Sequence, residues 1–90
     1  MTLSAHIQFI PLQEDAPMQA VDKAILMIQK SGVSHEVGPF GTSIEGNMTD
    51  VMKLIQCMLD STISEEFLLN VQYHVGQARL SNMDKVAKFR

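Results

Sequence analysis

The Gly-Pro-Phe-Gly stretch at residues 38–41 is the feature that most restricts the fold of this chain. It joins two short β-like segments, 33–37 and 41–46, and its glycines and proline supply the backbone angles of a tight turn. Helical periodicity stands on both sides of this hairpin, and a strand pattern stands beyond each helix. The sequence therefore predicts the order β-α-β-β-α-β.

The outer strands and the two helices follow from the spacing of apolar side chains. Residues 4–12 and 67–75 alternate along the chain, as strands with two different faces do. Residues 16–31 and 48–61 carry apolar side chains three and four positions apart, which predicts amphipathic helices. These four segments account for most of the chain outside the hairpin.

Several residues predict where these elements begin and end. Pro11 is expected to end the first strand, because proline has no N–H for the sheet. Asn47 is the expected N-cap of the second long helix. A short last helix is predicted over residues 82–89, with Ser81 as its cap.

This order is the ferredoxin-like, or split β-α-β, plan of the α+β class. Two right-handed crossovers place both long helices on one face of a four-stranded antiparallel sheet with the spatial order 4-1-3-2. Ninety residues fit a single domain, 1–90. A core of this size is modest, so self-association is a reasonable further source of stability.

Composition excludes several classes of function. The net charge of −3 argues against a nucleic-acid surface, which needs clustered lysine and arginine. Residues 1–12 contain no basic region and no long apolar run, so neither a signal peptide nor a membrane anchor is predicted. Cys57 is the only cysteine, which excludes an intrachain disulfide and favours a reducing cytoplasm.

No catalytic motif is present in the chain. The two glycines of residues 41–46 are not followed by lysine, so this stretch is not a phosphate-binding loop. There is no G-x-S-x-G elbow, and Cys57 has no evident base to activate it. We therefore expect a protein that is not an enzyme and that carries no cofactor.

The predicted topology assigns each strand residue to one face of the sheet. The face without helices is expected to carry polar side chains and two apolar ones: His6, Gln8, Ile10, Ser43, Glu45, Leu68, Asn70, Gln72 and His74. Matching the strand ends predicts that His6, Glu45 and His74 lie side by side. Gln8, Ser43 and Gln72 would form the next row. A register slip would change these rows.

Four interpretations of this face remain open. It is a solvated sheet face, as antiparallel sheets often have, or the seam of a structural or regulatory assembly module, which Ile10 and Leu68 would suit. His6, His74 and Glu45 together offer donors for a divalent metal, although no close-spaced ligand motif is present. An acid among amides also suits a small heterocycle, because Glu45 accepts hydrogen bonds from ring N–H or amino groups.

The most specific sequence pattern is E-V-G-P-x-x-T-x-I-E-G, residues 36–46, supported by the closing DKVAKFR. From about Ser4 to Arg90 the chain resembles the thiamine-binding protein family of YkoF-like, ferredoxin-like domains. This resemblance implies small, non-catalytic cytoplasmic proteins that bind thiamine or its hydroxymethylpyrimidine portion. It also implies homotetramers whose subunits cover one another's open sheet faces, and for this chain we expect a homodimer or homotetramer. The chain departs from the family at Ile10, where many relatives have an aromatic residue before the proline.

The resemblance gives weight to Thr42, Ser43 and Glu45 as ligand-binding residues. Phe40, expected to be exposed at the tip of the hairpin, could stack on a ring of the ligand. The full set of candidate ligand-binding residues is Glu45, Ser43, Thr42, Gln8, His6, Gln72, His74 and Phe40. Of these, Glu45 is the expected charged anchor for thiamine or a related pyrimidine.

Overall fold

β1 (Thr2–Leu12) runs through the middle of a four-stranded antiparallel sheet, between β3 (Thr42–Asn47) and β4 (Glu66–Val75). β2 (Ser34–Val37) pairs with the free side of β3. This computed structural model describes all 90 residues. Its strand order, β2-β3-β1-β4, is the expected 4-1-3-2 order read from the other edge, and it confirms the ferredoxin-like fold.

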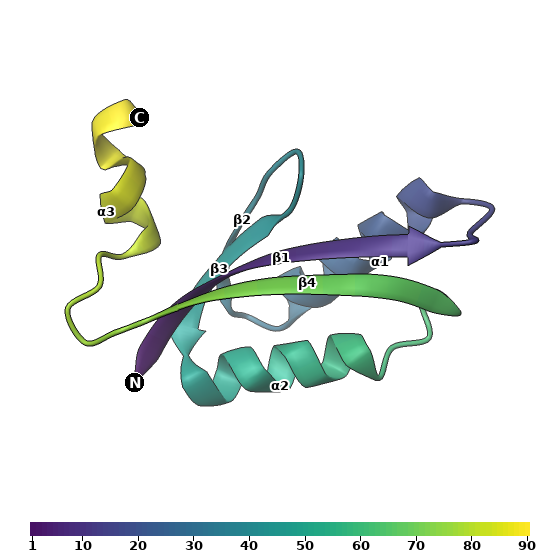
Figure 1. Cartoon of the computed structure of the whole chain (residues 1–90), viewed down its shortest axis with the longest axis horizontal. Coiled ribbons are helices and arrows are strands. Elements are labelled where there is room, and N and C mark those ends of the chain that lie inside the picture. Colours follow the sequence, from purple (N-terminus) through teal and green to yellow (C-terminus); the bar gives the residue numbers. More distant parts are fainter.

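The helices α1 (Pro17–Lys30) and α2 (Met48–Leu59) cover one face of the sheet (Figure 1). Between helices and sheet lies one core cluster: Leu3, Ala5, Ile7, Ala24, Ile28, Val33, Ile44, Val51, Leu54, Ile55 and Met58. α1 buries mainly small side chains, Ala20 and Ala24, toward the sheet. None of the helices is both long enough and apolar enough to cross a membrane.

The two predicted N-caps are present, and a glycine ends α1. The Asn47 side chain accepts a hydrogen bond of 2.8 Å from the backbone N–H of Asp50 at the start of α2. Gly32 follows α1 with a φ of +78°, a conformation that glycine adopts without steric cost. The Ser81 hydroxyl accepts a bond of 3.1 Å from the N–H of Asp84.

α3 (Asn82–Val86) continues into a single 3₁₀ turn, η1 (Ala87–Phe89). Figure 1 shows α3, in yellow, at the end of the sheet where β1 begins and well apart from α1 and α2. Residues 77–90, here called the C-terminal segment, thus return to the sheet after β4. Their contacts with it are on the face that α1 and α2 leave open.

Pro11 does not end β1, contrary to the sequence prediction. The strand continues to Leu12, and Pro11 stands opposite Phe67 of β4. The pairing of β1 with β3 ends at Ile7, so the later part of β1 has a partner only on the β4 side. A residue without an N–H is tolerated where a strand has a free edge.

Candidate functional site

The strand faces agree with the prediction, but the rows across the open face are shifted by two residues. Ser4 pairs with Glu45 on one side and with His74 on the other. His6 pairs instead with Ser43 and Gln72. The expected row of His6, Glu45 and His74 is therefore wrong, because β1 starts at Thr2, two residues earlier than its alternating pattern indicates.

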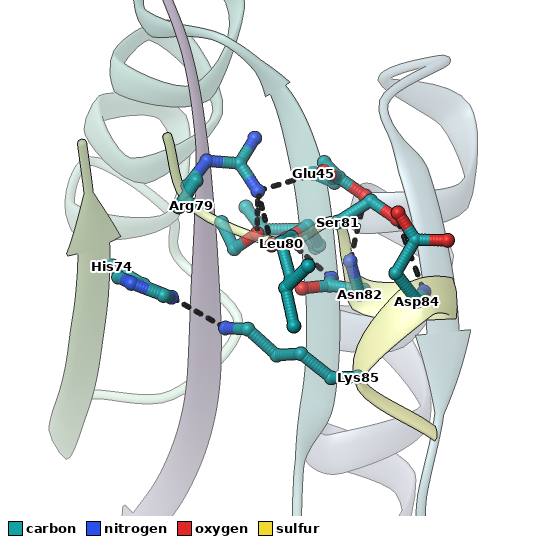
Figure 2. Close-up of polar contacts among 10 residues, drawn as sticks. Glu45, His74, Arg79, Leu80, Ser81, Asn82, Asp84 and Lys85 are labelled. Carbon is teal, nitrogen blue, oxygen red and sulfur yellow. Dashed lines mark hydrogen bonds and ion pairs between the residues drawn. The ribbon is translucent and has the colours of Figure 1, made fainter. Parts of the chain in front are cut away.

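Glu45 is not a free carboxylate on this face. Its Oε2 lies 2.8 Å from Nη1 of Arg79, whose side chain is only 6% exposed (Figure 2). Its Oε1 accepts a hydrogen bond of 3.2 Å from the backbone N–H of Asn82. The guanidinium neutralises the acid that the sequence singled out as the charged anchor.

Two further contacts fix the C-terminal segment to the sheet beside this ion pair. Arg79 Nη1 also donates to the hydroxyl of Ser4, at 2.7 Å, and Ser4 is buried beneath it. The Asn82 side-chain amide donates to the carbonyl of Ile44, at 3.0 Å. Glu45 therefore fixes the start of α3 above β1 and β3.

His74 and Lys85 form a separate contact on the β4 side. The Lys85 ammonium donates to Nδ1 of His74, as Figure 2 shows. A donor at that nitrogen occupies the lone pair of one of the two ring nitrogens that could bind a metal. With Glu45 bound to Arg79, the three residues of the metal hypothesis do not come together, and the structure contains no group of three or more acidic, histidine or cysteine side chains that could hold an ion.

A cavity of about 330 Å³ opens between the hairpin and α3. Sheet residues His6, Ser43 and Glu45 form its floor, and the exposed Phe40 stands at its rim. Asn82, Met83 and Val86 supply the wall on the α3 side. This open-face cavity brings together four of the eight residues that the sequence proposed.

The other four candidates lie elsewhere. Gln72 and His74 line a neighbouring depression on the β4 side of α3. Gln8 donates a hydrogen bond of 3.1 Å to the backbone carbonyl of Phe40 and so supports the hairpin tip. Thr42 does not face the open side at all: it pairs with Ile7 and is buried on the helix-facing side of the sheet.

Sequence reasoning missed the contribution of the C-terminal segment, above all Arg79 and Asn82. The available signal was Glu45, an acid in the central part of the open face; the other acids of that face, Glu36 and Glu66, lie on the edge strand β2 and at the start of β4. Such a carboxylate requires a cation if it is even half-buried. Arg79, in the short stretch before the Ser81 cap, was a candidate partner.

Residues 5–88 match the model of the thiamine-binding protein family. The chain belongs to this family. The name of the family refers to binding rather than to a reaction, which agrees with the absence of a catalytic motif.

Relatives of known sequence or structure span nearly the whole chain. A UPF0045 protein of Clostridium perfringens is 30% identical to it, over 99% of this chain and 98% of its own length. A solved domain of unknown function from Bacillus cereus is 26% identical, with a TM-score of 0.83 over 100% of this chain and 91% of that one. A Thermotoga maritima structure, provisionally described as a thiamine biosynthesis or salvage protein, shares the fold at 22% identity and a TM-score of 0.87, with full coverage of both chains.

Proposed function

We propose that this chain binds thiamine, or its hydroxymethylpyrimidine portion, in the open-face cavity and catalyses no reaction. Membership of the thiamine-binding protein family supports the ligand class. The observation that carries the location is the cavity of about 330 Å³ that joins His6, Ser43, Glu45 and Phe40. This volume is in the range of small-molecule sites.

The free polar groups of the cavity suit an aminopyrimidine. The side chains of Ser43 and His6 face the cavity and are not engaged in hydrogen bonds within the chain. A hydroxyl and an imidazole can each donate or accept, so they match the amino group and the ring nitrogens of the pyrimidine. Phe40, 84% exposed at the rim, can stack on the ring.

Glu45 has a different role from the one expected of a free anchor. Each carboxylate oxygen has two lone pairs, and each accepts one hydrogen bond from the C-terminal segment. One lone pair per oxygen is left for an amino group of the ligand. Glu45 is therefore proposed both to position the α3 wall and to contact the pyrimidine.

Isothermal titration calorimetry with thiamine and with hydroxymethylpyrimidine tests this proposal. We expect Ser43→Ala to weaken binding about fivefold, the effect of losing one hydrogen bond of about 1 kcal/mol. Thr62→Ala is the matched control, because Thr62 is exposed in the loop between α2 and β4 and lines none of these cavities. The proposal would be contradicted if neither ligand gave heat at millimolar concentration, or if Ser43→Ala bound as tightly as the wild type.

We also propose that the chain self-associates through the uncovered end of the open face. Ile10 and Leu68 stand opposite each other in the sheet and are 37% and 50% exposed. Two adjacent exposed apolar side chains on a sheet face suit a contact with a second subunit. Sedimentation velocity should show Leu68→Glu as a monomer at concentrations where the wild type associates. Leu59→Glu, on the outer side of α2, should leave the oligomer intact. If Leu59→Glu dissociates the oligomer and Leu68→Glu does not, the interface lies elsewhere.

A further inference from the structure

A second cavity, of about 290 Å³, lies on the opposite side of the sheet from the open-face cavity. Its walls are Ile7 and Phe9 of β1, Val21 and Ala24 of α1, and the loop 38–41. The same loop borders the open-face cavity, so residues 38–41 separate two cavities on the two faces of the sheet. We call the second one the helix-side cavity.

The helix-side cavity exists because side chains do not completely fill the core beside loop 38–41. α1 presents the small side chain of Ala24 to the sheet, and Gly41 has no side chain. Met18, which could fill the space, is 69% exposed instead. The space is thus bounded by a helix on one side and the flat sheet on the other.

Thr42 provides one polar group in these apolar surroundings. It is 3% exposed, and its hydroxyl forms no hydrogen bond within the chain. The hydroxyl is not sealed from solvent, because Thr42 lines the cavity. A molecule bound in the cavity displaces water from this hydroxyl, so a molecule that donates to it or accepts from it binds better than one that leaves it without a partner.

The lining determines the chemistry of the occupant. None of the residues that line the helix-side cavity is charged, so an ion would lose its hydration without compensation. Phe9 offers an aromatic wall, and Met18 and Met58 offer thioethers, which make favourable contacts with aromatic rings. We propose that the helix-side cavity binds a neutral, planar aromatic ring bearing one hydrogen-bonding substituent, with the Thr42 hydroxyl as its partner. This site is distinct from the open-face cavity and does not depend on the function proposed for it.

Phenol and toluene are suitable probes, because they have nearly the same shape and differ in the hydroxyl. Titration of ¹⁵N-labelled protein with each probe, followed by amide shifts, gives both location and affinity. Phenol is expected to shift amides of α1 from Ala20 to Ile28 and those of Gly41 and Thr42. Thr42→Val, which keeps the shape of the side chain, should weaken phenol at least threefold and should not weaken toluene.

A second variant tests the site without changing Thr42. Val21→Phe places a larger side chain at a half-buried position of the wall and should abolish binding of both probes. Two outcomes would overturn the inference: phenol shifts no amide of α1, or Thr42→Val weakens phenol and toluene equally.

The same variants separate this inference from the proposed function. If thiamine binding weakens in Ser43→Ala while phenol shows no site, the helix-side inference fails and the proposed function stands. If Thr42→Val weakens thiamine and Ser43→Ala does not, the helix-side cavity is supported as a ring site. The open-face location is then overturned.

Discussion

Replacing Glu45 with glutamine is expected to release the C-terminal segment from the sheet. The amide retains one acceptor oxygen and turns an NH₂ group toward the donors Arg79 and Asn82. The Arg79 guanidinium would then be a buried charge without a partner, and its Nε already lacks one. Breaking a buried ion pair in this way costs about 3–5 kcal/mol when the remaining charge stays buried.

The segment can avoid this cost by leaving the sheet, which returns Arg79 to water. We therefore expect local opening of residues 77–90 rather than global unfolding. Trypsin should cleave the Glu45→Gln variant rapidly after Arg79, a bond protected in the wild type. Hydrogen exchange should accelerate at the Asn82 amide and leave β1 and β4 unchanged.

Two variants serve as controls: one removes an acid from a different ion pair, and the other removes the arginine instead of the glutamate. Glu36→Gln removes an acid that pairs with Arg90 on the surface, where both side chains are more than half exposed, and should change stability by less than about 1 kcal/mol. Arg79→Met leaves Glu45, which is 24% exposed and can be hydrated, so its effect should be smaller than that of Glu45→Gln. Unchanged trypsin protection in Glu45→Gln would show that this pair does not hold the segment.

The same pair limits what substitution of Glu45 can reveal about ligand binding. α3 forms one wall of the open-face cavity, so opening the segment would weaken binding even if Glu45 never contacted the ligand. Ser43 is adjacent in the cavity but has no part in fixing the segment. For this reason Ser43→Ala, and not Glu45→Gln, is the informative test of the site.

The architecture was predictable because each element has a strong local signal. The alternation of residues 67–75 and the turn at 38–41 depend only on neighbours in sequence. The face of each strand residue follows from the same alternation, which is why Ser43 and Glu45 were placed correctly on the open side. Thr42 is grouped with them only through the family motif. It alternates with Ser43 along β3 and therefore lies on the helix-facing side of the sheet.

The register and the C-terminal contacts could not be predicted in the same way. A shift of two residues keeps every side chain on its face, so the alternating pattern cannot distinguish His6 from Ser4 as the neighbour of Glu45. The Arg79–Glu45 contact joins positions 34 residues apart. It depends on the path of the chain after β4, which the Ser81 cap alone does not determine.

Gly41→Ala is expected to destabilise the protein by about 2 kcal/mol, because it overpacks the base of the hairpin. A Cβ at this position would lie 2.6 Å from Cε1 and Nε2 of His6 and 2.7 Å from the carbonyl oxygen of Ile7. The imidazole can rotate away. The Ile7 carbonyl cannot, since Ile7 is paired with Thr42 of β3 and Val71 of β4. The loop must move instead, which strains the 2.8 Å bond between Gly38 N–H and the Gly41 carbonyl.

Urea denaturation of three variants separates these causes. Gly76→Ala is the control: its Cβ would meet nothing closer than 4.0 Å, so stability should be unchanged or rise slightly through the lower entropy of the unfolded chain. The double variant His6→Ala/Gly41→Ala removes the contact with the ring but not the contact with the backbone, and it should recover only part of the loss. Full recovery would show that the imidazole alone requires glycine. Partial recovery would place the constraint in the backbone of β1, because the Ile7 carbonyl passes against Gly41.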